Sequence, residues 1–146
     1  MRNTAFIKTL VIFISAVVLG ACGSGGGGAT PPASGNLDGS FGTNGVVTTP
    51  IGSVSFAKAM AIQSDGKIVA AGIAQNSTTT EFALVRYNAT GNLDTSFGPN
   101  GTGIVTRQVS STSNRINAVA IQSDGKIIVV GNFQVINITY MILARY

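Results

Sequence analysis

An eight-residue stretch that occurs twice constrains the fold of this chain most. Residues 61–68, Ala-Ile-Gln-Ser-Asp-Gly-Lys-Ile, recur unchanged at residues 120–127, 59 positions later. Each copy reads as two apolar strands joined by a two-residue turn, Asp65-Gly66 in the first and Asp124-Gly125 in the second. A type I′ turn needs positive φ at both central residues, which Asp-Gly tolerates. The duplication therefore predicts two copies of one antiparallel unit.

The remaining sequence aligns on this stretch and divides into two repeats, residues 36–91 and 92–146. Each repeat opens on the motif Asn-Leu-Asp-x-Ser-Phe-Gly, at 36–42 and 92–98, and the spacing between matching segments differs only in loops. We expect four strands in each, at 46–49, 57–63, 67–73 and 81–87, and at 104–108, 116–122, 126–132 and 138–146.

The third expected strand of each repeat is apolar on both faces, at 68–72 and 127–131. Such a strand needs a layer on each side, which neighbouring sheets stacked face to face supply. Four antiparallel strands in about 55 to 60 residues are typical of a propeller blade. The predicted fold class is all-β, with two four-stranded antiparallel β-propeller-like blades that form an incomplete propeller.

The repeats resemble a known family. The opening motif, followed by Gly-Val-Val-Thr, Ala-Ile-Gln-Ser-Asp-Gly-Lys-Ile-Val and Phe-Ala-Leu-Val-Arg-Tyr-Asn-x-x-Gly, is similar to the delta-60 repeat, a bacterial propeller-type repeat, over residues 36–146. The resemblance implies tandem copies in surface or secreted bacterial proteins, a propeller-like fold and no established catalytic role.

Two repeats are fewer than the roughly four to eight blades of a closed propeller. The second repeat stops at Arg145-Tyr146, where the matching Arg86-Tyr87 runs on into further sequence. Three explanations stay open. The sequence is a truncated product, several chains assemble through open blade edges, or the two sheets pack as a small sandwich with exposed edges.

The first 21 residues read as a signal peptide, with a basic start and a short apolar run at 10–19. Leu19-Gly20-Ala21-Cys22 resembles the bacterial lipoprotein lipobox, which implies a lipidated Cys22 as the new N-terminus. Two or three acyl chains hold a protein at a membrane more firmly than one. The alternatives are plain secretory cleavage near Ala21, with an incidental cysteine, or an uncleaved anchor helix.

Residues 22–35 form a Gly-, Ser- and Pro-rich linker after that cysteine. Gly23 stands where an Asp would resemble an inner-membrane retention signal, which favours the outer membrane if the host has two. The expected location is therefore the bacterial cell envelope. With one cysteine in the sequence, no intramolecular disulfide is possible.

The basic character of the chain does not indicate nucleic-acid binding. Two of the nine basic residues, Arg2 and Lys8, lie in the leader, and the others are spread singly among the repeats. Expected partners are instead the membrane, through the lipid anchor, and a protein or glycan ligand.

Histidine is absent and the single cysteine is assigned to lipidation, which removes the usual catalytic nucleophile pairs and zinc sites. We expect no catalytic residue, metal or cofactor. In the opening motif we expect Asp38 and Asp94 to cap a turn through a carboxylate-to-backbone bond, in preference to a calcium site. Phe41 and Phe97 are expected to fill the space between blades.

The arginines Arg86 and Arg145 recur at equivalent positions, and we interpret them as edge-strand charges or partners of a loop aspartate. The sequence thus predicts a non-enzymatic, lipid-anchored envelope protein that serves as a binding or scaffold module or is a fragment of a longer repeat protein. The alternative is a remnant of a secreted propeller enzyme or carbohydrate-binding propeller.

Overall fold

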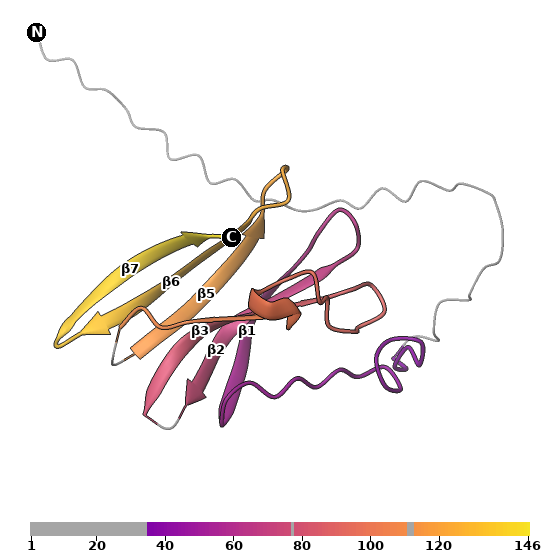
Figure 1. Cartoon of the computed structure of the whole chain (residues 1–146), viewed down its shortest axis with the longest axis horizontal. Coiled ribbons are helices and arrows are strands. Elements are labelled where there is room, and N and C mark those ends of the chain that lie inside the picture. Colours follow the sequence, from indigo (N-terminus) through magenta and orange to yellow (C-terminus); the bar gives the residue numbers. More distant parts are fainter. Residues whose placement is uncertain (1–34, 77, 111–112) are drawn as a thin grey trace, which may run out of the picture. The chain divides into compact units, whose positions relative to one another are not determined.

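The computed structural model describes residues 35–76, 78–110 and 113–146. This part of the chain contains seven strands and one short 3-10 helix (Figure 1). The elements are β1 (Val54–Ile62), β2 (Ile68–Asn76), β3 (Thr79–Tyr87), η1 (Pro99–Gly101), β4 (Ile104–Arg107), β5 (Ser113–Ile121), β6 (Ile127–Val135) and β7 (Ile138–Arg145). Within these ranges no helix has the length and apolar character of a membrane span. The expected signal peptide, most of the linker and Cys22 lie outside the described residues.

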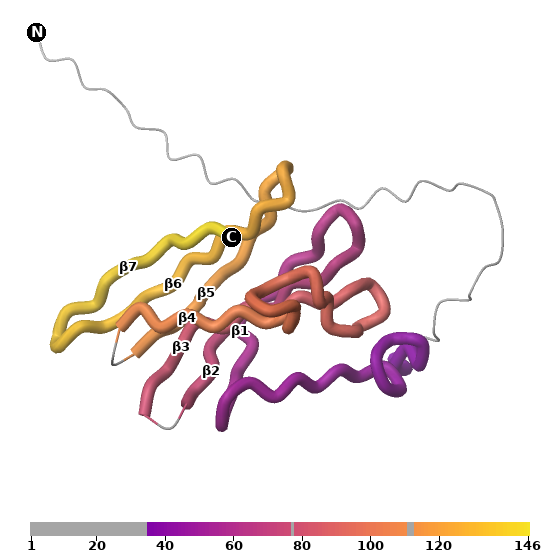
Figure 2. Tube along the Cα trace, in the orientation of Figure 1, coloured from indigo at the N-terminus to yellow at the C-terminus, as the bar shows by residue number. Residues whose placement is uncertain are grey.

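The strands form two antiparallel sheets. Sheet 1 has the order β1-β2-β3-β4, and sheet 2 has the order β5-β6-β7. The Cα trace in Figure 2 follows each sheet as a meander, so strands that are consecutive in sequence lie side by side. The predicted all-β class with propeller-like antiparallel sheets is confirmed.

The assignment of residues 104–108 to the second blade is wrong. This segment forms β4, which pairs with β3 of sheet 1, in the register Leu84↔Val105 and Val85↔Ile104. Sheet 2 therefore has three strands among the described residues, not the expected four. The sequence repeats and the sheets are out of phase, because the first strand of the second repeat completes the sheet of the first.

The expected strand at 46–49 is also corrected. The structure has only an isolated bridge there, Thr43↔Val46, and residues 47–50 carry no regular structure. This segment aligns with β4, whose partner β3 belongs to the preceding repeat. A strand needs a neighbour to satisfy its backbone groups, and no described residue takes the place of that neighbour for 46–49.

The hairpin turns are not the predicted type I′. Gly66 and Gly125 have φ of 82°, but neither Asp65 nor Asp124 has positive φ. The amide of Gly66 donates to the Gln63 carbonyl at 2.9 Å, and the amide of Gln63 to the Lys67 carbonyl at 2.8 Å. This is a three-residue connection with one left-handed glycine, and the second copy has the same bonds. The carboxylate of Asp65 accepts the backbone amide of Lys67, which favours the ordinary φ at that aspartate.

The core lies between the two sheets and joins different faces of the two. We define the front face of each sheet by Val69 and Leu84 in sheet 1 and by the equivalent Ile128 and Leu143 in sheet 2. The back face is the opposite side. Buried residues of the core come from the front face of sheet 1 and the back face of sheet 2: Val69, Ala71, Phe82, Leu84, Ile116, Ile127 and Val129, with Phe97 from the loop before η1. The front face of sheet 1 therefore packs on the back face of sheet 2, an arrangement that we call head to tail.

Candidate functional site

The second copy of the opening motif is tied to strand β3 through Arg86. The Arg86 Nε donates to Asp94 Oδ2 at 2.8 Å, and Nη2 donates to Ser96 Oγ at 3.0 Å. The guanidinium lies over the ring of Phe97, 4.6 Å from its centre. Both charged side chains are largely shielded from water, with exposed fractions of 17% for Arg86 and 10% for Asp94. The motif therefore fixes the chain between β3 and β4.

Hydrogen bonds from the hydroxyl and the backbone amide of Ser96, and then the charge of Arg86, lower the pKa of Asp94 below its ordinary value. The carboxylate is therefore the form that this site stabilises. The structure places Asp94 and Phe97 together at this point, as the two sides of one arginine clamp.

The first copy of the motif has the same turn but lacks the arginine. Asp38 Oδ1 accepts the Ser40 amide at 2.9 Å and the Ser40 hydroxyl at 2.6 Å, and these bonds lower the pKa of Asp38. No cation pairs with Asp38 within the described residues. Phe41 is half-buried and lies beside Gly91. The motif at 36–42 is therefore preformed without its partner.

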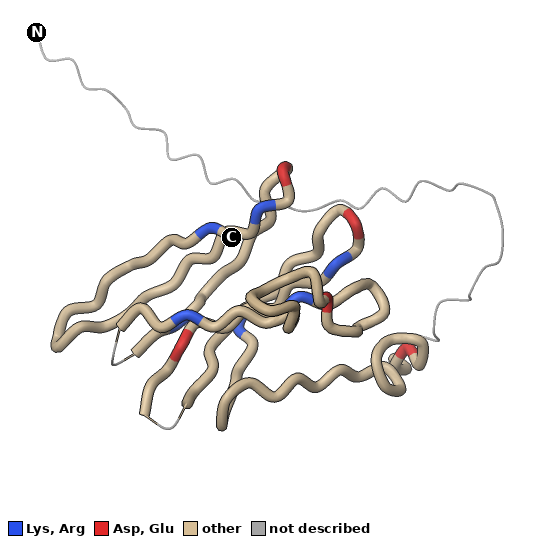
Figure 3. The backbone as a smooth tube through the Cα atoms, viewed as in Figure 1, with Lys and Arg blue, Asp and Glu red and all other residues tan. Residues whose placement is uncertain are grey.

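The arginine that corresponds to Arg86 in sheet 2 is Arg145, on the outer strand β7. Among the residues that the structure describes, Arg145 makes no hydrogen bond or ion pair, and β7 has no strand beside its outer edge. Figure 3 shows the charged residues spread over the strands and turns, with acidic and basic residues close together at the two hairpin turns. Among the described residues, Asp38 is thus an aspartate without the arginine of the clamp, and Arg145 is an arginine without the aspartate.

The apolar side chains of β3 and β7 show the same mismatch. Phe82 and Leu84 are 1% and 0% exposed, whereas their equivalents in β7, Met141 and Leu143, are 84% and 70% exposed. These four side chains belong to the front faces of the two sheets. The front face of sheet 2 therefore exposes apolar side chains at positions that are buried in sheet 1.

The back face of sheet 1 is the matching surface. Met60 and Ile62 of β1 are exposed there, while their equivalents Val119 and Ile121 in β5 pack against the core. Each sheet thus has one face in the interface and one face outside it.

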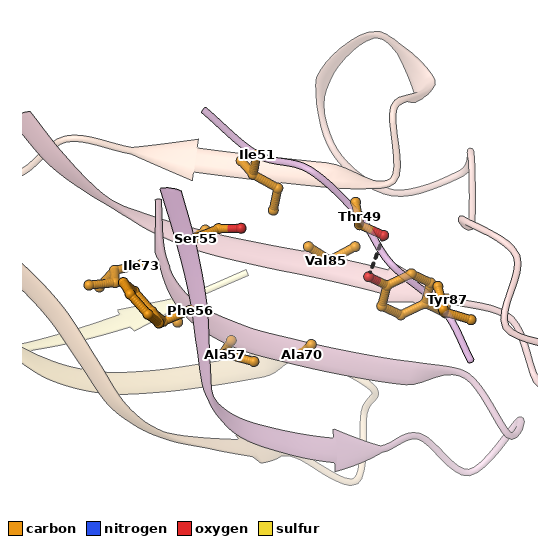
Figure 4. Close-up of a pocket in the computed structure, with 13 residues that line it drawn as sticks. Thr49, Ile51, Ser55, Phe56, Ala57, Ala70, Ile73, Val85 and Tyr87 are labelled. Carbon is orange, nitrogen blue, oxygen red and sulfur yellow. Dashed lines mark hydrogen bonds between the residues drawn. The ribbon is translucent and has the colours of Figure 1, made fainter. Parts of the chain in front are cut away.

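The segment at 47–51 crosses the back face of sheet 1 and borders a groove of about 200 Å³ (Figure 4). The hydroxyl of Tyr87 donates to Thr49 Oγ1 at 2.7 Å. Beyond its end, the chain is attached to β2 at Ser53, because the amide and the hydroxyl of Ser53 donate to the Gln75 carbonyl at 2.8 and 2.9 Å. The segment is therefore held in place by side chains and by the bonds of Ser53.

Sequence reasoning missed the polar contacts that join the two sheets. Asn114 in β5 is fully buried, and its backbone amide and its Nδ2 donate to Thr80 in β3 at 2.9 and 2.5 Å. At the hairpin end, Gln63 Nε2 donates to the Gly125 carbonyl at 3.1 Å. Gln63 belongs to the duplicated stretch, and its recurrence as Gln122 was the available signal.

All five acidic residues of the sequence lie in the described part. Each accepts a hydrogen bond or ion pair from a residue close in sequence or on a neighbouring strand: Asp38 from Ser40, Asp65 from Lys67, Glu81 from Asn76, Asp94 from Arg86 and Ser96, and Asp124 from Lys126. The lysine partners lower the pKa of Asp65 and Asp124. The described residues contain no group of three or more His, Cys, Asp or Glu that could hold a metal ion.

Two stretches of the chain match a family model. Residues 63–97 and 122–146 match the family described as "Domain of unknown function (DUF5122) beta-propeller". Each match begins at the glutamine before a hairpin turn and continues through the two strands that follow. The matched stretches cover less than half of the chain, and they support a propeller-type repeat module. Comparison with curated proteins and with solved structures gave no match.

Proposed function

We propose that this chain is a non-enzymatic scaffold or binding module that is held at the bacterial cell envelope by lipid on Cys22. Two observations carry the proposal: every acidic side chain accepts a hydrogen bond or ion pair within the protein, and the open face of sheet 2 exposes the apolar side chains of Met141 and Leu143. An acid or base catalyst needs a titratable group free to reach a substrate. Exposed apolar surface of this kind marks sites of interaction.

Anchoring is supported by the sequence that precedes the sheets. The lipobox-like Leu19-Gly20-Ala21-Cys22 is followed by a linker rich in Gly, Ser and Pro that spaces the folded repeats from a membrane surface. In this arrangement the membrane supplies the attachment and the sheets supply the surface for partners.

Metabolic labelling tests the anchor. The full chain is expressed in bacteria fed an alkyne-modified palmitate, and we expect label on the wild-type protein and its recovery in the membrane fraction. Cys22→Ala should remove the label, while Ser24→Ala, two residues further along the linker, should keep it. An unlabelled wild-type protein, or equal label on Cys22→Ala, would exclude lipid attachment at Cys22.

A further inference from the structure

We propose that two copies of this chain dock head to tail. The front face and outer edge of sheet 2 in one copy cover the back face of sheet 1 and the segment 36–49 in the next copy. This goes beyond the scaffold role by naming the partner, and it does not depend on lipid at Cys22. The chain itself contains the template, because the front face of sheet 1 already packs on the back face of sheet 2.

The apolar parts of the proposed interface have matched equivalents inside the molecule. In the internal interface, Phe82 and Leu84 of β3 lie in the same core as Val119 and Ile121 of β5. The exposed equivalents are Met141 and Leu143 on one side and Met60 and Ile62 on the other. Docking of the second copy would bury both sets at once, with apolar surface as the driving force.

The charges are complementary in the same register. In a docked pair, Arg145 of one copy takes the place of Arg86, and Asp38 of the second copy takes the place of Asp94. Asp38 is already oriented by Ser40, so its free carboxylate oxygen corresponds to the one that binds Arg86 in the internal clamp. A charge pair with such geometry fixes the register of an interface.

The backbone edges also fit. The outer edge of β7 has no paired strand, and residues 47–49, which align with β4, make no backbone-to-backbone hydrogen bond among the described residues. Thr49 is held by Tyr87, so this segment lies in place before a partner arrives. Addition of a strand to an open sheet edge is a common mode of protein recognition.

An interface of this kind is heterologous, so a chain of docked copies keeps one free surface of each type, at its two ends, until a ring closes. A closed propeller contains about four to eight blades, which roughly two to four copies of this chain would supply. The proposal therefore predicts a small closed oligomer, or a chain of copies if the rotation does not close.

Cysteine cross-linking tests the register. Ala83 pairs with Thr106 inside sheet 1, and the equivalent pair between copies is Ile142 with Thr48. In a Cys22→Ala background, full-length chains with Thr48→Cys and with Ile142→Cys, carrying different tags, are mixed in mild detergent and oxidised. We expect mixed disulfide dimers well in excess of same-variant dimers. The matched control, Ala83→Cys with Thr106→Cys in one chain, should form an intrachain bond.

Charge reversal provides a second test. By sedimentation at about 100 μM, where a micromolar interface is occupied, the wild-type chain should have the mass of an oligomer. Arg145→Asp and Asp38→Arg should each weaken association by about tenfold or more, and the mixture of the two should recover dimers. Thr95→Ala, a change at an exposed loop position outside the proposed interface, should have no effect.

A monomeric wild-type chain at that concentration would overturn the proposal. Mixed disulfide dimers no more abundant than random pairing of the two cysteine variants predicts would also overturn it. Lack of recovery in the charge-reversed mixture, with both variants folded by circular dichroism, would also overturn it. Lipid labelling at Cys22 is unaffected by any of these outcomes, so failure of the docking model is distinct from failure of the anchor.

Discussion

Strands β3 and β7 occupy the same position in the two repeats, yet they lie in opposite environments. Strand β3 has β4 on its outer edge, the other sheet over its front face and Asp94 beside its arginine. Strand β7 has none of these among the described residues. The difference comes from the neighbouring repeat and not from the strand sequence, because both segments contain Arg-Tyr at the same position and keep a leucine two residues before the arginine. In this fold the repeat that follows supplies both the outer strand of a sheet and the sheet that buries its front face.

The largest contrast is expected from the two equivalent leucines. Leu84→Ala leaves a cavity in the core and should lower the free energy of unfolding by about 3 kcal/mol. Leu143→Ala removes an exposed side chain and should change it by less than about 0.5 kcal/mol in dilute solution. Urea denaturation of the two variants at low protein concentration measures both values. Equal losses would show that β7 is covered as β3 is.

A somewhat smaller effect is expected at the polar contact between the sheets. Asn114→Ala removes a buried amide and leaves its partners in Thr80 and Ser110 without those bonds, which should destabilise the fold by about 2 kcal/mol. Ser55→Ala, the equivalent change in exposed β1, should be within about 0.5 kcal/mol of wild type. Urea unfolding compares the two variants. A loss of about 2 kcal/mol on Ser55→Ala as well would show that Ser55 makes a stabilising contact on the back face of sheet 1.

The turn between β6 and β7 contains a residue whose backbone is unfavourable for its type. Ile136 has φ of 54° and is exposed, and a β-branched residue rarely adopts that conformation. Ile136→Gly should therefore stabilise the chain by about 1 kcal/mol. Val135→Gly, on the adjoining strand residue, is the control and should destabilise it. Thermal unfolding decides the sign, and a loss on Ile136→Gly would mean that the isoleucine side chain contributes packing.

The smallest effect is expected from the two aspartates of the repeated motif. The pKa of Asp94 is lowered in the folded chain, so its stabilising effect is present above the ordinary carboxyl pKa and is lost as the pH falls through the folded-state value. Asp94→Asn should reduce the pH dependence of the unfolding midpoint in that acidic range more than Asp38→Asn, because Asp94 pairs with an arginine and Asp38 does not. Equal pH profiles for the two variants would argue against the clamp.

The hairpins were predictable because their determinants are local. A repeated Asp-Gly-Lys sequence between apolar segments indicates a turn and two strands, and β1–β2 and β5–β6 lie where the repeat placed them. The turn type was predicted incorrectly because the Asp65 side chain bonds to the Lys67 amide and supports an ordinary φ. A short-range pattern does not specify that choice.

The partner of a short strand was not predictable in the same way. Residues 104–107 and 46–49 have similar sequences, Ile-Val-Thr-Arg and Val-Val-Thr-Thr, but only the first lies beside a preceding β3. Strand pairing depends on distant neighbours, so β-propensity alone gives both segments the same prediction. The contacts of Gln63 and Asn114 were missed for the same reason, since their partners lie in the other sheet.

Hydrogen exchange tests most directly whether a repeat obtains its outer strand from the next one. In dilute solution we expect the amides of residues 104–107 to be protected by pairing with β3, and those of residues 47–49 to exchange as fast as an unpaired segment. Protection of 47–49 should then increase with protein concentration as copies dock. Fast exchange at 104–107, or equal protection of the two segments at every concentration, would contradict the account.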